Sequence, residues 1–123
     1  MNRARPVNLN LLTIRFPIPA IVSILHRIAG VILFLFIPIA LWVLDFSLTQ
    51  DGFDALHDWR GNIFTKLAIW AILAAFIFHL IAGVRHLLSD VRLGSSLQGG
   101  RATSWLTFIT FFILVILAGI WLW

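Results

Sequence analysis

The sequence predicts an all-α membrane protein with three transmembrane helices. Of its 123 residues, 61% are hydrophobic and only 11% carry a charged side chain, a composition that small soluble domains do not show. Three stretches without a charged residue cover 28–44, 67–84 and 102–123. Since about 20 helical residues cross the ~30 Å hydrocarbon layer, each stretch with its flanks is long enough to span a bilayer.

Prolines mark the start of the first predicted helix. Pro17 and Pro19 do not suit a helix interior because each lacks a backbone donor, but Pro19 suits a first helical turn. We therefore expect a helix over about 19–44. Pro38 lies inside it, and membrane helices tolerate such a proline as a kink.

The second and third helices are predicted at about 62–88 and 104–123, the last with Ser104 as its N-cap. Between them, a run of small and polar residues predicts a mobile connection without a fold of its own; it contains Gly94, Ser95, Ser96, Gly99 and Gly100. The sequence has no internal repeat, so 1–123 is expected to form a single membrane-anchor domain.

The distribution of lysine and arginine predicts the orientation. Four such residues precede residue 28, two lie in the first loop and three in the second, and cytoplasmic loops carry the excess of these residues. We expect the N-terminus and the second loop in the cytoplasm and the C-terminus on the other side. Tryptophans near the first loop and the C-terminus would form an interfacial belt there; these are Trp42, Trp59, Trp121 and Trp123.

Other classes of protein are excluded by composition. The chain has no cysteine, so it holds no disulfide, no iron–sulfur cluster and no covalently attached haem, and a metal would need histidine ligands. Its arginines lie at membrane boundaries rather than in one basic patch, which argues against nucleic-acid binding. Arg3, Arg5 and Arg15 leave no apolar segment for a cleavable signal peptide, so we expect the N-terminus to be retained.

His79 is the most informative residue because it interrupts the apolar stretch 67–84. An imidazole in a membrane is costly unless it faces a cavity, a polar partner or a cofactor. Its helical face is shared by small residues and a second histidine, which leaves room for a flat group; these are Ala75, Ala82, Gly83 and His86. His79 is thus a candidate iron ligand of b-type haem, the alternative being a packing histidine bonded to a neighbouring carbonyl.

A polar cluster is predicted at the cytoplasmic ends of the first two helices. Ser23, His26, Arg27 and Gly30 share one helix face. The second helix carries polar residues at the same leaflet, namely Arg85, His86 and Asp90. Cations at this depth could pair with haem propionates or another buried anion; the candidate cofactor-binding residues besides His79 are His26, Arg27, Arg85 and His86.

A quinone is the second candidate ligand. Ser23 and Arg27, one turn apart, could hold a quinone carbonyl oxygen, while Asp90 lies close to the water from which quinone reduction takes protons. In the simpler interpretation the arginines snorkel to lipid headgroups, Ser23 bonds within its own helix and His86 is interfacial. His26 and His86 lie at the boundary and only His79 lies deep, so a six-coordinate haem needs a second ligand from another polypeptide.

Two motifs carry a resemblance to a known family. The stretch from Arg5 through Leu11, continued by Ser23 to Arg27, and the run from His79 to Asp90 resemble the two signatures of the cytochrome b556 subunits of proteobacterial succinate dehydrogenases. The chain departs from these signatures at Ala29 and Ser89. Neither is a proposed ligand.

The resemblance implies half of a heterodimeric anchor bundle in the bacterial inner membrane, with an iron–sulfur subunit and a flavoprotein subunit docked on its cytoplasmic side. It implies that His79 and a second hydrophobic anchor subunit supply the two axial ligands of haem b, and that His26 and Arg27 lie near the propionates. Ser23 and Arg27 map to the quinone pocket, with ubiquinone expected, and Asp90 to the entry of protons. Succinate would be oxidised in another subunit. A fumarate reductase anchor and a haem-free structural or transport subunit remain alternatives.

Overall fold

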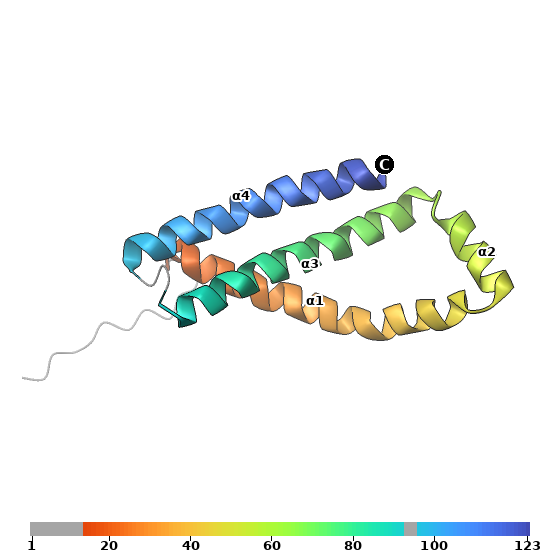
Figure 1. Ribbon diagram of the computed structural model, residues 1–123, viewed down its shortest axis with the longest axis horizontal. Coiled ribbons are helices and arrows are strands. Elements are labelled where there is room, and N and C mark those ends of the chain that lie inside the picture. The colour runs from red at the N-terminus through yellow and green to blue at the C-terminus, as the bar shows by residue number, and fades with distance from the viewer. Residues whose placement is uncertain (1–13, 93–95) are drawn as a thin grey trace, which may run out of the picture.

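A computed structural model describes residues 14–92 and 96–123, which form four helices (Figure 1): α1 (Ile18–Ser47), α2 (Gln50–Trp59), α3 (Ile63–Asp90) and α4 (Leu97–Leu122). Three of them, α1, α3 and α4, are long and apolar enough to cross a membrane. The predicted all-α membrane fold is confirmed. The first half of the N-terminal motif, together with Gly94 and Ser95, lies outside the described residues.

Helix α1 follows the prediction closely. Pro17 is its N-cap and Pro19 lies in its first turn, where a missing backbone donor costs nothing. The helix continues through Pro38 to Ser47, three residues beyond the predicted end. Helix α3 also begins where predicted. Asn62 is its N-cap, and the Oδ1 of Asn62 accepts the backbone N–H of Phe64 at 2.8 Å.

The predicted start of the last helix is wrong. Helix α4 begins at Leu97, and its N-cap is Ser96, whose Oγ accepts the N–H of Gly99 at 3.0 Å. Ser104 is not a cap: it is fully buried, and its hydroxyl donates to the Gly100 carbonyl at 2.7 Å. Packing against α3 overrides the low helix propensity of Gly99 and Gly100, so both are helical rather than part of a loop.

Helix α2 was not predicted, because its ten residues are too few and too polar for a span. Thr49 caps it by accepting the N–H of Gly52 at 3.1 Å. Its acidic residues share one side, while Leu56 and Trp59 line an apolar cavity of about 520 Å³ between α1 and α3. Helix α2 therefore closes the end of the molecule at which α1 and α3 diverge (Figure 1).

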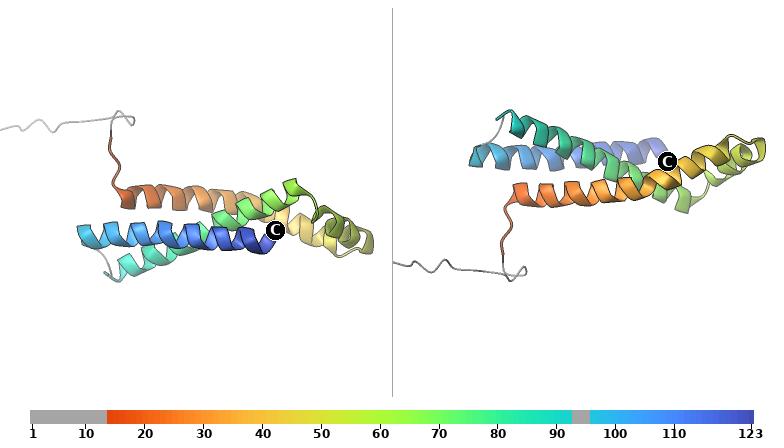
Figure 2. Two further views of the ribbon diagram at one scale, coloured as in Figure 1. Left: turned by 90° about the horizontal axis from the view of Figure 1, so that it is seen from above. Right: turned by 90° about the horizontal axis from the view of Figure 1, so that it is seen from below.

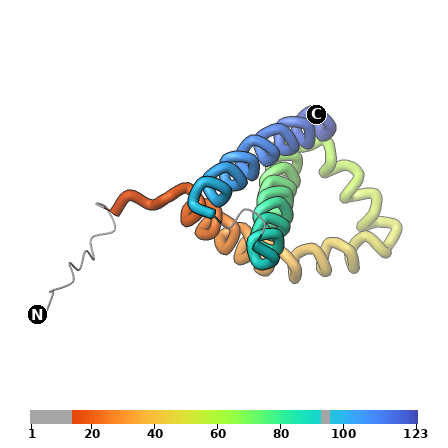
Figure 3. The backbone as a smooth tube through the Cα atoms, turned by 60° about the vertical axis from the view of Figure 1, so that its left-hand side comes forward, coloured from red at the N-terminus to blue at the C-terminus, as the bar shows by residue number. Residues whose placement is uncertain are grey.

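Helix α3 is the central element, with α1 and α4 packed against it (Figure 2). Val22 and Ala29 of α1 and Phe78 and Ala82 of α3 form the buried core, to which Phe108 and Phe111 of α4 add partly buried rings. At the other end, Trp70 Nε1 donates to the Val115 carbonyl at 2.9 Å. Figure 3 shows the C-terminal end of α4 beside the start of α3, where Lys66 lies 5.8 Å from the Trp123 ring centroid.

Candidate functional site

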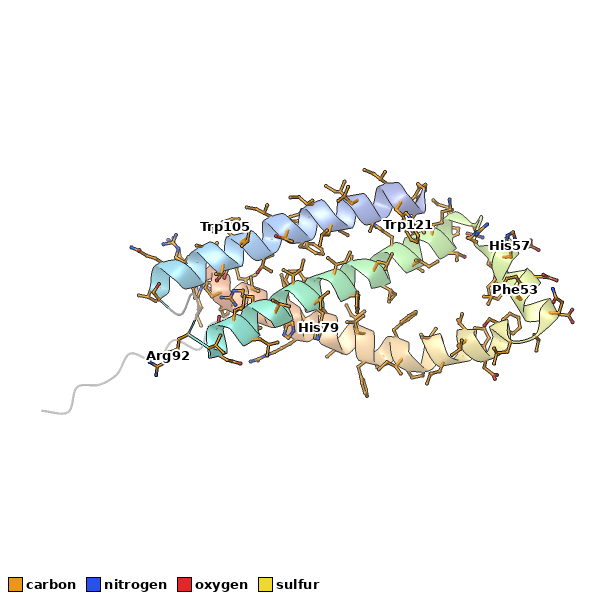
Figure 4. The ribbon with its side chains drawn as sticks, viewed as in Figure 1. Phe53, His57, His79, Arg92, Trp105 and Trp121 are labelled. Carbon is orange, nitrogen blue, oxygen red and sulfur yellow. The ribbon has the colours of Figure 1, made fainter. Side chains whose placement is uncertain are left out.

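His79 lies on the side of α3 that faces α1 (Figure 4). Its Nδ1 is 3.1 Å from the backbone carbonyl oxygen of His26. The two imidazoles are stacked, with centroids 4.1 Å apart and planes inclined by 13°. His79 is therefore held on one face by a ring and at one nitrogen by a carbonyl, both belonging to the same residue of α1.

The carbonyl contact determines which nitrogen of His79 carries the proton. A carbonyl oxygen can only accept, so Nδ1 is the N–H donor and Nε2 of the neutral ring keeps its lone pair. No buried side-chain nitrogen or oxygen lacks a partner in the described part of the chain. His79 is half-buried, and its Nε2, which has no hydrogen bond within 14–92 and 96–123, thus lies where another group can approach it.

His86 completes a cluster of three imidazoles. Its ring centroid is 5.2 Å from that of His26, with the planes inclined by 50°. His26 and His86 are both half-buried, and Asp90, one turn further along α3, is exposed at the helix end. The structure therefore brings together His26, His79 and His86. The expectation that only His79 lies deep is wrong for His26, whose ring and carbonyl contact His79 directly.

Small residues allow the rings to fit between the helices. A Cβ atom built on Gly30 would lie 3.0 Å from His79 Cε1, and one on Gly83 would lie 3.5 Å from His26 Nε2. The small-residue face predicted to leave room for a flat group thus accommodates the His26 ring against His79. The stacking itself was not predicted. The spacing of His26 and Gly30, one turn apart on the same face, was the signal for it.

Arg85 is not part of this cluster. Its Nε donates to the Thr103 hydroxyl at 3.3 Å and its Nη2 to the Gly100 carbonyl at 3.4 Å, both on α4. The guanidinium lines a cleft of about 270 Å³ between α3 and α4. Since residues 79 and 85 are about 120° apart around the helix, the two side chains leave α3 in different directions.

Ser23 and Arg27 lie on α1 next to His26. Ser23 is half-buried and Arg27 is exposed, so the guanidinium is available to a ligand or partner at this end of the bundle. Among the described residues no group of three or more histidine, cysteine or acidic side chains is arranged to hold a metal ion. In the part of the chain that the structure describes, Nε2 of His79 is left without a hydrogen bond, and Ser23 and Arg27 lie within one turn of His26 on α1.

The opposite end of the molecule is aromatic and acidic. Phe46 stacks between Trp42 and Trp59, at centroid distances of 5.7 and 6.1 Å. Trp121 lies at this end too, together with Phe53 and His57 of α2 (Figure 4). The predicted belt tryptophans therefore gather at one end, about one span away from the histidines.

Comparison with known proteins adds independent information. Residues 1–118 match the family model described as succinate dehydrogenase/fumarate reductase transmembrane subunit. The chain is 42% identical to the succinate dehydrogenase cytochrome b556 subunit of Coxiella burnetii, over the full length of both chains. It is 35% identical to the subunit of that name from Rickettsia bellii, over 82% of this chain and 79% of the relative. It is 33% identical to the one from Paracoccus denitrificans, over 81% and 78%.

Proposed function

The chain belongs to the family of succinate dehydrogenase and fumarate reductase transmembrane subunits, and we propose that it binds haem b and quinone as a membrane anchor of succinate:quinone oxidoreductase. The relatives named above are all succinate dehydrogenase subunits, which favours succinate oxidation over fumarate reduction. The single observation that carries the haem assignment is the hydrogen-bonded Nδ1 of His79, which leaves Nε2 as a ligand.

This chain would provide one histidine nitrogen, Nε2 of His79, as a ligand to the haem iron. Ligating histidines usually donate their second nitrogen to a carbonyl or carboxylate, which fixes the ring and raises its basicity, and His79 has that arrangement. When bound, haem b would supply a reversible one-electron store. The other ligand of the iron would come from the second hydrophobic anchor subunit.

Cationic and imidazole groups would hold the haem carboxylates. Arg27 and His86 lie toward the same end of the bundle as His26, where propionates would reach the membrane surface. Arginine forms strong, charge-assisted hydrogen bonds to carboxylates. We assign this role to His26, Arg27 and His86; Arg85 would support it indirectly, by joining α3 to α4.

Quinone would bind on the same end of α1. The Ser23 hydroxyl and the exposed Arg27 guanidinium lie one turn apart and would donate hydrogen bonds to a quinone carbonyl oxygen, stabilising the negative charge that develops there on reduction. The carboxylate of Asp90 is exposed at the end of α3, where it can exchange protons with water. The head group would be that of ubiquinone.

The quinone site implies where the partners dock. Electrons that arrive from an iron–sulfur subunit must enter near Ser23 and Arg27, so this subunit and the flavoprotein would sit at the histidine end. The positive-inside distribution of lysine and arginine favours a cytoplasmic location for that end. The chain would lie in a bacterial inner membrane, with its N-terminus in the cytoplasm and its C-terminus in the periplasm.

The assignment is tested by replacing His79. In the purified complex we expect His79→Ala to remove or strongly weaken the b-type band of the reduced-minus-oxidised spectrum, because Nε2 is lost. His57→Ala is the matched control: His57 is exposed on α2, and among the described residues its ring hydrogen-bonds to Arg60 alone. An assembled His79→Ala complex with full haem content and an unchanged spectrum would refute the ligand, and a wild-type complex without haem would favour a purely structural anchor.

A further inference from the structure

Two aromatic N–H groups of α3 donate to backbone carbonyls of neighbouring helices. Trp70 Nε1 donates to Val115 of α4 at 2.9 Å, and His79 Nδ1 donates to His26 of α1 at 3.1 Å. A carbonyl inside an α-helix already accepts the backbone N–H four residues further along. Each of these two carbonyls therefore has to offer its second lone pair to a side chain from outside the helix.

In both cases the residue four positions after the carbonyl is a glycine. Gly30 follows His26, and Gly119 follows Val115. A Cβ on Gly30 would lie 3.0 Å from His79 Cε1 and 3.4 Å from Nδ1, and a Cβ on Gly119 would lie 3.2 Å from Trp70 Nε1. Because a helical Cβ tilts toward the N-terminus, a side chain covers the turn before its own residue. Glycine leaves the carbonyl in that turn open.

We propose that Gly30 is a positioning residue for the metal-binding histidine: by lacking a side chain it exposes the His26 carbonyl, which then fixes the tautomer and the direction of His79. The inference rests on the proposed haem site. It goes beyond that site by assigning a role to a residue that touches neither iron nor quinone. The Trp70 contact beside Gly119 shows the same local arrangement where no ligand is proposed.

The hydrogen bond at Nδ1 of His79 would influence the redox potential of the bound iron. A hydrogen bond from Nδ1–H to a carbonyl increases electron donation from Nε2, and this stabilises the oxidised iron. A Cβ at position 30 would push the ring away from the carbonyl by a few tenths of an ångström, given the 3.0 Å contact. The weakened bond should make the iron easier to reduce, which raises the midpoint potential.

The test compares Gly30→Ala with Gly119→Ala in the whole complex. Both changes add one methyl group beside a carbonyl that accepts an aromatic N–H, but only the first affects His79. We expect Gly30→Ala to retain haem, to raise its midpoint potential and to change the g-values of its ferric EPR signal. Gly119→Ala should leave both properties as in wild type. Equal potentials and EPR spectra for the two variants would overturn the proposal.

Failure of the haem site itself would give a different result. If His79→Ala retained haem, the proposed function would fail whatever Gly30→Ala did. If Gly30→Ala did not assemble, pulsed EPR of the unmodified complex would supply the second measurement. At least one non-coordinating imidazole nitrogen should then show the quadrupole coupling of a hydrogen-bonded N–H, and couplings typical of unbonded imidazole at every such nitrogen would overturn the proposal.

Discussion

Four polar side chains within the three spans form hydrogen bonds of two kinds. The hydroxyls of Ser104 and Thr107 donate to carbonyls of their own helix, at 2.7 and 3.0 Å. His79 and Trp70 donate to carbonyls of other helices. An unpaired polar group in hydrocarbon costs several kcal/mol, so both arrangements are stabilising. The second also joins helices, and in His79 it leaves the other nitrogen available to a ligand.

Ser23 and Arg27 on α1, which would bind quinone, can be tested by comparing quinone reduction with dye reduction; since Arg27 is also assigned to the haem carboxylates, the haem content of each variant is measured as well. Arg27→Leu would remove the proposed charge-assisted hydrogen bond to quinone, typically worth ~1.5–3 kcal/mol, so we expect quinone reduction by succinate to fall by roughly tenfold or more. Ser23→Ala should have a smaller effect in the same direction. Electron transfer from succinate to a soluble dye should stay within about twofold of wild type, because it does not require the quinone site.

Arg101→Leu is the matched control for this experiment, since Arg101 is also exposed at the same end of the bundle but lies on α4. It should reduce neither activity. A parallel fall of quinone and dye reduction in assembled Arg27→Leu complexes would contradict the quinone assignment.

At the scale of helices, the lengths of the apolar stretches predicted the three spans, and single residues near their ends predicted where α1 and α3 begin. Pro19 and Asn62 act within one turn, so their effect can be inferred from sequence. The start of α4 could not, because the helical state of Gly99 and Gly100 depends on tertiary contacts, including the Arg85 hydrogen bond to the Gly100 carbonyl. Helix α2 was missed because its pattern is amphipathic over only ten residues.

Helix α2 depends on the corner that joins it to α1. Gly52 is buried, and a Cβ there would clash with the Phe46 carbonyl and lie 2.8 Å from Thr49 Oγ1. Since overpacking typically costs about 1–3 kcal/mol, Gly52→Ala should lower the thermal stability of the complex in detergent and expose this loop to protease. Gly61→Ala, whose Cβ would meet its nearest neighbour at 3.6 Å, should be close to neutral. Equal melting temperatures for the two variants would contradict the packing at this corner.

At the scale of the whole molecule, the chain is an incomplete bundle. Its buried core is small, and apolar side chains on all three spans are exposed, among them Phe34, Leu80 and Ile120. Such surfaces are covered by lipid or by partner helices in a membrane. The sequence predicted that His26 and His86 lie toward the same end of the bundle, because the depth of each follows from its place in a span. It placed His79 deeper and did not predict that His26 stacks on it. The direction of Arg85 was not predictable, because it depends on where α4 packs.

The two ends of the molecule differ in a way that makes its orientation testable. The histidine end carries Arg15, Arg92 and Arg101, whereas α2 at the other end carries Asp51, Asp54 and Asp58. Lysine and arginine are retained on the cytoplasmic side of a membrane. The chain has no cysteine, so single-cysteine variants report unambiguously. In intact cells with a permeable outer membrane, a membrane-impermeant maleimide should label Asp54→Cys on α2. It should label Gln98→Cys, at the start of α4, only after the inner membrane is opened. Both positions are exposed, and neither change removes a positive charge that could set the orientation. The reverse labelling pattern would place the histidine end, and the proposed quinone site with it, on the periplasmic side.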